Sequence, residues 1–372
     1  MTQYSDALRR VIDEVVAPAA IDVDKAGTFP RDAITALGEA GILGLTVSQS
    51  VGGGGLGLPE AADVVRTLAG VCGSTAMVVL MHYAATILIE NHGPEDVRQA
   101  IGAGHHLATV AFSEAGSRSH FWYPQSSAVA EGDNVRLDAH KSWITSAGEA
   151  DSYVWSSRPV AAEGLMTLWL VPASTEGLGP AGAFDGLGLR GNRSAPVEGS
   201  GVIVPASAML GADGAGLDVA LAEILPWFLV MSAAFSVGLM DAVTAETGAH
   251  LVSTRLEHLD QSLAEQPVIR LDHARMRVAT DQAAALLADT LAALGAGRPD
   301  AMLRVLEVKA AAGEAAITVT DLAMKVCGGA AFRRELGVER RFRDARAARV
   351  MAPTTDQLLD FIGRAINGLA LL

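Results

Sequence analysis

The pattern of apolar and polar positions divides the chain into three stretches, and the first, residues 1–107, is helical. Apolar side chains recur at helical spacing in residues 32–45, and this run ends among glycines. The glycine-rich run 52–57 stops one helix before Pro59 opens the next, and Gly93-Pro94 marks another turn. We therefore expect an N-terminal helical domain.

Residues 108–215 have the pattern of short strands. Four of the five tryptophans fall in this stretch. Its runs of β-branched and apolar residues, broken by Gly, Asp and Pro, are 108–114, 127–132, 135–139, 152–157 and 165–173. This pattern predicts a small antiparallel β domain.

Residues 216–372 return to a helical pattern. The Ala- and Leu-rich runs are 217–257, 267–295 and 301–327. Helices of this length must pack on one another to bury their apolar faces. The expected fold class is mainly α with a central β domain, without an internal repeat or a low-complexity linker.

Composition narrows the function classes. The length of 372 residues suits two or three domains of about 150 residues each. Half of the residues are hydrophobic but only 5% are aromatic, which suits packed helices and excludes disorder, collagen and a disulfide scaffold. The net charge of −14 disfavours a nucleic-acid partner.

The sequence is typical of a cytoplasmic protein. Cys72 and Cys327 are too few for a disulfide framework, which fits a reducing compartment. The N-terminal segment is charged and amphipathic, unlike a signal peptide. Two uncharged runs, Thr67–Ile89 and Ile224–Met240, contain polar or helix-breaking residues, so we expect buried helices and no membrane span.

The sequence contains no motif for several common kinds of catalytic or binding site. His105 and His106 are adjacent, so they share no helix face, and no metal-ligand spacing surrounds them. We expect them to be exposed loop residues. The chain has no GxSxG elbow and no GxGxxG after a strand, which disfavours a serine hydrolase and a Rossmann nucleotide site.

Four polar patches carry the candidate chemistry. They are residues 111–120, residues 141–146, Arg255 with Gln266, and Gly328-Gly329 followed by residues 338–344. The hydroxyls and free amides of a Gly/Ser loop such as 111–120 suit a phosphate or a flavin carbonyl. Taken alone, residues 111–120 and 141–146 are better explained as ordinary turns, Arg255 with Gln266 fits a solvated helix end, and the last patch fits a charged helix cap. Their order along an α–β–α chain makes the set informative.

In this order, the patches resemble the acyl-CoA dehydrogenase superfamily of flavoproteins over essentially the whole chain. Residues 41–57 resemble a family segment that ends in Gly-Gly-x-Gly, and residues 113–119 resemble its flavin loop. Gly188-Leu-Arg-Gly191 and Arg343-Asp344-Ala345 continue the match. The resemblance implies three domains: an N-terminal helical domain (1–107), a middle antiparallel β-barrel (108–215) and a C-terminal four-helix bundle (216–372).

The resemblance also implies an FAD site that two subunits share, and hence a homodimer or homotetramer. Phe112 and Ser113 would lie along the isoalloxazine and Ser119 near the pyrophosphate. Trp143 and Thr145 would cover the flavin, with Thr145 near N5. The other implied cofactor contacts are Arg255, Gln266, Lys325, Gly328, Gly329, Thr354 and Asp356, of which the first two reach an FAD bound mainly to the neighbouring subunit.

The chain departs from the family at the proton acceptor. The family removes an α-proton from a thioester while a hydride goes to flavin N5, so a carboxylate must lie beside the α-carbon. Counted from Arg343-Asp344-Ala345, the position of that Glu is Ala352, and Pro353 replaces the Gly that follows it. The position used by other members falls at Phe228 or Leu229. None of these residues is a base.

His120 is the one candidate replacement base. The expected substrate-binding residues are Ser119, His120 and Pro353. The alternative for His120 is packing over the flavin edge together with Trp122 and Tyr123.

Three functions follow. The first is α,β-dehydrogenation of an acyl thioester, on coenzyme A or a carrier protein, with a non-standard or partner-supplied base. The second is flavin-dependent monooxygenation, which needs no α-proton base. The third is a base-less subunit of a hetero-oligomeric dehydrogenase, which contributes half of an FAD site. The overall match favours the first function, and the missing Glu favours the other two.

Overall fold

The computed structural model describes residues 3–117, 120–334 and 336–371, which form two compact units. The first unit runs to Val64 and includes Ser74–Gly186 and Arg190–Phe228. The second consists of Val65–Gly73, Leu187–Leu189 and Leu229–Leu372. Ser119, an expected FAD and substrate contact, lies outside the described residues.

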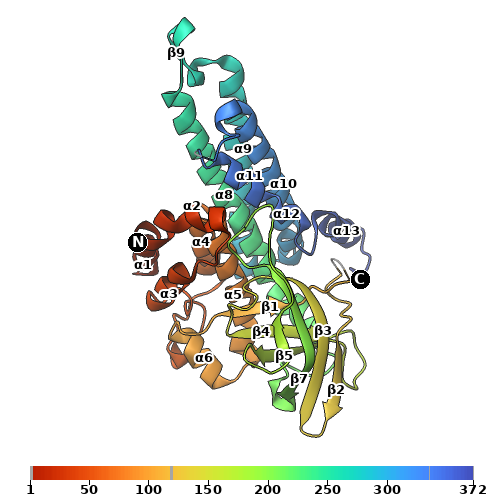
Figure 1. Ribbon diagram of the computed structural model, residues 1–372. Helices are drawn as coiled ribbons and strands as arrows, with labels where there is room; N and C mark the ends of the chain where they lie inside the picture. The colour runs from red at the N-terminus through yellow and green to blue at the C-terminus, as the bar shows by residue number, and fades with distance from the viewer. Residues whose placement is uncertain (1–2, 118–119, 335, 372) are drawn as a thin grey trace. The chain divides into compact units, whose positions relative to one another are not determined.

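The N-terminal part is helical, as the pattern predicts (Figure 1). Its α-helices are α1 (Gln3–Val11), α2 (Ala17–Ala26), α3 (Arg31–Glu39), α4 (Leu58–Ala69), α5 (Gly73–His92) and α6 (Glu95–Gly102). A π-helical turn, Ile12–Val16, joins the first two helices, and a 3-10 turn, Gln49–Val51, precedes the glycine-rich run.

The two uncharged runs form buried helices. Gly73–His92 and Gly216–Ser253 are the described segments long and apolar enough to cross a membrane. In their most apolar windows, 83% and 67% of the residues are buried inside the protein, which is the behaviour of core helices.

A buried histidine ties α5 to its surroundings. His82 Nδ1 accepts a hydrogen bond from the Ala108 amide at 3.1 Å, and its Nε2 lies 3.0 Å from the Leu43 carbonyl, to which it donates. These two partners require the neutral ring with the proton on Nε2. Burial lowers the pKa of His82 to about 4.

The middle part contains two sheets. Its strands are β1 (Ala108–Ala111), β2 (Ser127–Glu131), β3 (Asn134–Ile144), β4 (Ser152–Ser157), β5 (Thr167–Pro172), β6 (Leu178–Pro180) and β7 (Ala195–Pro205). The sheet orders are β1-β4-β5 and β2-β3-β7-β6. The pairs are antiparallel except β1 with β4, which run parallel. Trp155 and Trp169 are paired across β4 and β5, and both are buried in the core.

The two strands of the middle part that the sequence pattern did not predict are β6 and β7. Strand β7 alternates buried and exposed residues on both sides of Gly199-Ser200-Gly201. There, Gly201 has φ +64°, and the register against β3 shifts between Leu137 and Ala139. A bulge therefore interrupts the alternation, and glycine supplies the left-handed backbone that the bulge requires.

The C-terminal part is helical. Its α-helices are α7 (Gly216–Val219), α8 (Leu225–Ser253), α9 (Pro267–Gly295), α10 (Ala301–Cys327), α11 (Val338–Ala345), α12 (Ala347–Val350) and α13 (Thr355–Ile366). A π-helical turn, Ala220–Ile224, joins α7 to α8, and the small ladder of β8 (Arg255–Leu256) with β9 (Gln261–Ser262) lies between α8 and α9. Helix α10 packs against α9, α11, α12 and α13. The predicted order of helical, β and helical parts is confirmed.

Candidate functional site

Two expected flavin contacts begin a loop at the end of β1. Phe112 is 8% exposed and stacks on Phe121, with ring centroids 6.4 Å apart. The Ser113 carbonyl accepts a hydrogen bond from the Ser142 amide at 2.9 Å. The loop is thereby fixed to β3 at its start.

A buried ion pair closes the base of this loop. Glu114 Oε1 lies 2.6 Å from Lys141 Nζ, and neither side chain is more than 2% exposed. The same carboxylate accepts hydrogen bonds from the Gln125 amide, the Ser126 amide and the Ser126 hydroxyl. Burial would raise the pKa of Glu114, but Lys141 and the other donors outweigh it and keep that pKa below its ordinary value. One carboxylate therefore holds both ends of the loop.

Trp143 is an exposed aromatic residue of this part. A register shift between Lys141 and Ile144 marks a bulge at the end of β3, and within it Trp143 has φ +59°. A left-handed backbone costs such a residue roughly 1–2 kcal/mol, and strain of this kind gathers at functional sites. The indole is 72% exposed, whereas Trp155 and Trp169 are buried.

Thr145 is buried two residues later. Its hydroxyl lies 3.1 Å from the Ser194 hydroxyl, and its carbonyl accepts a hydrogen bond from Thr109 Oγ1 at 2.9 Å. In a pair of hydroxyls one donates to the other, so one O–H of the Thr145–Ser194 pair remains able to donate to a ligand.

These residues fit FAD. The exposed indole of Trp143 offers a flat apolar face to a planar ring system. Ser117 Oγ, in the expected flavin loop, is buried and has no hydrogen-bond partner among the residues that the structure describes. A buried hydroxyl without a partner costs roughly 1–3 kcal/mol, so a ligand that supplies one is favoured.

The candidate base His120 and the carboxylate nearest in sequence to Phe228 and Leu229, Glu223, differ in their surroundings. His120 is exposed, and its ring meets Trp122 edge-on at 5.1 Å. Glu223, in the turn before α8, accepts hydrogen bonds from Asn91 Nδ2 and His92 Nε2, each at 2.8 Å. Within the described residues His120 is therefore exposed with one aromatic contact, whereas two side chains hold Glu223.

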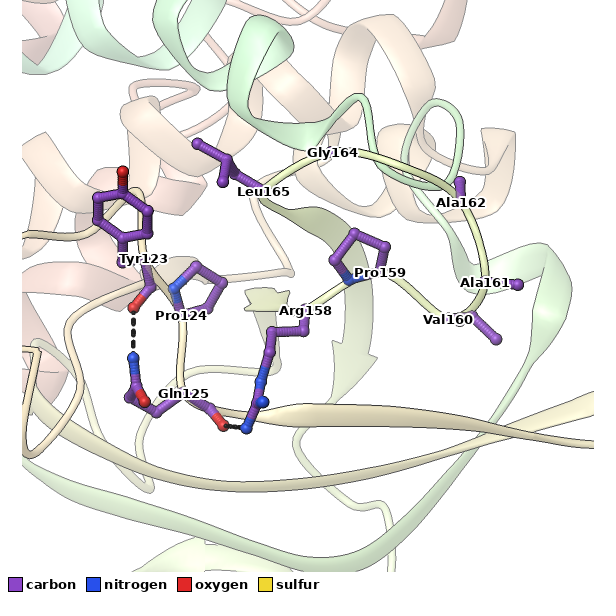
Figure 2. Close-up of a pocket in the computed structure, with 10 residues that line it drawn as sticks. All are labelled: Tyr123, Pro124, Gln125, Arg158, Pro159, Val160, Ala161, Ala162, Gly164 and Leu165. Atoms are coloured by element: carbon purple, nitrogen blue, oxygen red, sulfur yellow. Dashed lines mark hydrogen bonds between the residues drawn. The ribbon is translucent and has the colours of Figure 1, made fainter. Parts of the chain in front are cut away.

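A cavity of about 510 Å³ lies beside the end of the loop (Figure 2). Its lining residues are Tyr123, Pro124, Gln125, Arg158, Pro159, Val160, Ala161, Ala162, Gly164 and Leu165. The dashed lines in Figure 2 mark the hydrogen bonds from Arg158 Nη2 to the Gln125 carbonyl at 2.7 Å and from Gln125 Nε2 to the Tyr123 carbonyl at 3.1 Å. Arg158 is the one charged residue of this lining, and the sequence analysis did not single it out.

In the second unit, Arg255 and Gln266 lie at the two ends of the connection between α8 and α9. Arg255 is paired with Ser262 in the β8–β9 ladder, and its guanidinium donates to the Asp260 carbonyl at 2.9 Å and to the Asp260 carboxylate. Gln266 Nε2 donates to Gln261 Oε1 at 2.8 Å. The fold thus brings the two predicted residues onto one small hairpin.

Gly328 and Gly329 follow α10 with an open backbone. Gly328 has φ +56° and ψ −136°, a conformation available mainly to glycine. A Cβ built on either glycine meets no atom within 4 Å, which leaves room for the close approach of a cofactor. Lys325, one turn earlier, forms an ion pair with buried Asp272 at 2.7 Å. The hydrogen bond from Lys325 is the main reason why the pKa of Asp272 lies below its ordinary value.

The segment between α12 and α13 carries the position of the missing carboxylate. Ala352 is partly exposed and Pro353 is buried. Thr354 caps α13 through a capping box, in which its amide donates to Gln357 Oε1 at 3.1 Å. Asp356 is exposed in the first turn of this helix. The predicted cofactor residues Thr354 and Asp356 therefore lie at a well-defined helix start.

Lys309 is a residue of this region that the sequence analysis missed. Its Nζ donates hydrogen bonds to the Met351 carbonyl at 3.0 Å and to the Pro353 carbonyl at 2.7 Å. These two carbonyls flank Ala352.

The structure offers no metal site within its described ranges. No group of three His, Cys, Asp or Glu residues there is arranged to hold an ion. His105 is exposed as expected, but the expectation is wrong for His106, which is partly buried and whose Nε2 is hydrogen-bonded to Ser152 Oγ at 2.7 Å.

Three family models match successive parts of the chain. All three describe acyl-CoA dehydrogenases: the N-terminal domain matches residues 2–104, the middle domain 109–202 and the C-terminal domain 214–367.

Individual relatives agree with these models. The human mitochondrial short-chain specific acyl-CoA dehydrogenase is 28% identical over 358 residues, which cover 94% of this chain and 85% of that protein. Butyryl-CoA dehydrogenase from Megasphaera elsdenii has a TM-score of 0.91 at 22% identity and covers 99% of this chain and 98% of its own. A prolyl acyl carrier protein oxidase has a TM-score of 0.89 at 20% identity, with 98% and 99% covered. At these identities the two solved structures show a shared fold.

Proposed function

Because the chain belongs to the acyl-CoA dehydrogenase family, whose members are FAD-dependent flavoproteins, we propose that it is a cytoplasmic enzyme that dehydrogenates an acyl thioester between its α and β carbons. FAD, when bound, supplies the hydride acceptor. The protein binds and orients both molecules and provides a path for the α-proton.

Trp143 is the observation that carries the cofactor assignment. Its strained backbone presents an indole that nothing in the described chain covers, at the end of the strand that also holds the loop base. In the proposed enzyme this indole lies against the flavin, with Thr145 beside it. The other proposed FAD contacts are Phe112, Ser113, Ser119, Arg255, Gln266, Lys325, Gly328, Gly329, Thr354 and Asp356.

The hairpin between α8 and α9 supports a shared site. Arg255 is exposed, Gln266 is partly exposed, and both are polar. Their hydrogen-bond partners, Asp260 and Gln261, are adjacent residues of the same hairpin. In the proposed assembly they reach the FAD of a second subunit. The enzyme is then a homodimer or a homotetramer.

The cavity beside Arg158 supports a phosphate-bearing substrate. An arginine at the edge of an otherwise uncharged cavity suits a phosphate group, because guanidinium donates charge-assisted hydrogen bonds. Both coenzyme A and the phosphopantetheine arm of a carrier protein carry such a group. Ser119, His120 and Pro353 are the proposed contacts nearer the reacting carbons.

The proton acceptor separates this proposal from its alternatives. Ala352 cannot accept a proton, and the positions on α8 are apolar. His120 is the candidate base within the chain, and a neighbouring polypeptide is the other source. The absence of a carboxylate at position 352 is the specific observation that favours a monooxygenase or a base-less subunit of a hetero-oligomer.

Anaerobic titration of the purified protein with acyl thioesters tests the proposal. Loss of the long-wavelength flavin absorbance, with one chain length preferred, is the expected result, and parallel titrations with acyl-CoA and an acylated carrier protein identify the carrier. FAD that no thioester reduces would refute the dehydrogenase. Oxygen- and substrate-dependent NADH oxidation with a flavin reductase would then identify a monooxygenase, and a protein that binds FAD only with a Glu-containing paralogue would identify a hetero-oligomer subunit.

A further inference from the structure

Lys309 is a buried lysine in the middle of α10. It is 2% exposed, and hydrogen bonds from its Nζ reach the Met351 and Pro353 carbonyls. In the chain as far as it is described, no carboxylate lies within ion-pair distance of this Nζ. Its two partners are therefore both backbone carbonyls on a segment 42 and 44 residues away.

A lysine in this position is energetically unusual. Burial without an opposite charge disfavours the ammonium form and lowers the pKa of Lys309 to about 7. An apolar residue of the same length would avoid this desolvation but would leave two carbonyls without a donor. The side chain is therefore explained by its contacts with the carbonyls better than by packing alone.

The two contacts constrain the backbone on both sides of Ala352. The Met351 carbonyl fixes the peptide plane before Ala352, and the Pro353 carbonyl fixes the plane after the proline. Between them the proline ring restricts its own φ. The capping box at Thr354 holds the segment at its other end. Few backbone angles remain free, so the direction of the Ala352 Cβ is set.

We infer that Lys309 is a positioning residue, which holds the 351–354 segment so that position 352 and the start of α13 form a fixed wall of the site. This inference rests on the proposed function in one respect, namely that residues 352–356 face FAD and the acyl group. The anchoring itself follows from the hydrogen bonds and does not depend on the reaction.

Hydrogen–deuterium exchange of the purified holoprotein tests the anchoring. Lys309→Met keeps the length of the side chain and removes its donor, whereas Lys309→Gln keeps a neutral donor. Lys25→Met, at an exposed lysine, is the matched control. In Lys309→Met we expect exchange at the hydrogen-bonded amides of Met351 and Thr354 to rise at least tenfold, while peptides from α9 stay unchanged. Lys309→Gln is expected to show a smaller rise at the same amides.

Unchanged exchange at these amides, or an equal rise throughout the second unit, would overturn the inference. If Lys309→Met does not fold, Lys309→Gln decides the question by the same two criteria. FAD binding provides a separate readout, because a displaced wall should raise the FAD dissociation constant and shift the visible flavin band. A local rise in exchange without a change in FAD binding would uphold Lys309 as the anchor and refute the assignment of residues 352–356 to the flavin site.

Discussion

Replacing Lys141 with methionine should sharply destabilise the protein. The substitution conserves length but leaves the Glu114 carboxylate, which is at most 2% exposed, without its cation. Removing one partner of a buried pair typically costs about 3–5 kcal/mol, because the remaining charge stays desolvated. Glu114 keeps three donors from Gln125 and Ser126, so we expect a loss near the lower end, about 3 kcal/mol. Urea unfolding at saturating FAD measures it, and Trp155, whose ring centroid lies 4.9 Å from Lys141 Nζ, provides a fluorescence signal.

The pH dependence of this loss tests the stated cause. In the wild type, Lys141 and the other donors hold the pKa of Glu114 below its ordinary value, so the pair contributes stability above that value and loses it as the pH falls. In Lys141→Met the cation is absent, burial raises the pKa, and protonation at low pH relieves the buried charge. The loss should therefore be larger at pH 8 than at pH 5. The double variant Glu114→Gln/Lys141→Met should recover part of it, and Lys25→Met should lose less than about 0.5 kcal/mol. A loss that is independent of pH, or no recovery in the double variant, would refute the reasoning.

Three further predictions concern other parts of the molecule. Burial lowers the pKa of His82 to about 4, so the free energy of unfolding should be at its full value above pH 6.5 and fall by about 3 kcal/mol as the pH drops towards 4. Urea unfolding of His82→Gln should lack this pH-dependent loss. Trp143→Ala should change the free energy of unfolding little, since this residue is 72% exposed. It should weaken FAD binding about tenfold, because roughly 1.5 kcal/mol of aromatic stacking is lost. An unchanged FAD dissociation constant from fluorescence titration would contradict the flavin contact. Ala352→Glu should raise the rate of anaerobic flavin reduction by an acyl-CoA by about 10²–10⁴-fold, the usual contribution of a positioned general base; retained FAD without any gain would mean that the pocket, Pro353 included, does not fit that substrate.

Helical periodicity identified the long helices because apolar residues recur regularly along them. The predicted helices 267–295 and 301–327 have the bounds of α9 and α10. Strand β7 was missed although its outer parts alternate regularly. The bulge at Gly199-Ser200-Gly201 shifts the alternation by one position, and two glycines in three residues resemble a turn when only the sequence is read.

The long-range polar contacts could not be predicted from the sequence. Glu114 and Lys141 belong to separate patches, and their pairing depends on how β1 and β3 are brought together. Lys309 follows an Ala- and Leu-rich helical pattern, in which a single lysine is usually a solvated residue. Its two partners are backbone carbonyls, which any residue carries, so the sequence holds no signal of them.

Some of the most specific motif residues turn out to be packing contacts. Asp344 Oδ1 accepts a hydrogen bond from the Leu189 amide at 2.6 Å, and Arg343 donates to the Leu187 carbonyl at 3.1 Å. A Cβ on Gly188 would lie 2.5 Å from the Arg343 carbonyl, so glycine is required by this close approach. The two distant motifs therefore contact each other within the second unit.

Two local costs of the first unit lie at Trp143, a proposed FAD contact, and at Ser117, in the loop that follows the proposed contacts Phe112 and Ser113. Trp143 has a left-handed backbone, which costs roughly 1–2 kcal/mol. Ser117 has a buried hydroxyl without a partner in the described chain, which costs roughly 1–3 kcal/mol. A ligand that binds only the folded protein stabilises it by about 4 kcal/mol at a thousand times its dissociation constant, which is similar in size to the two costs together. In the proposed enzyme, FAD binding therefore offsets the costs that the described chain leaves at Trp143 and Ser117.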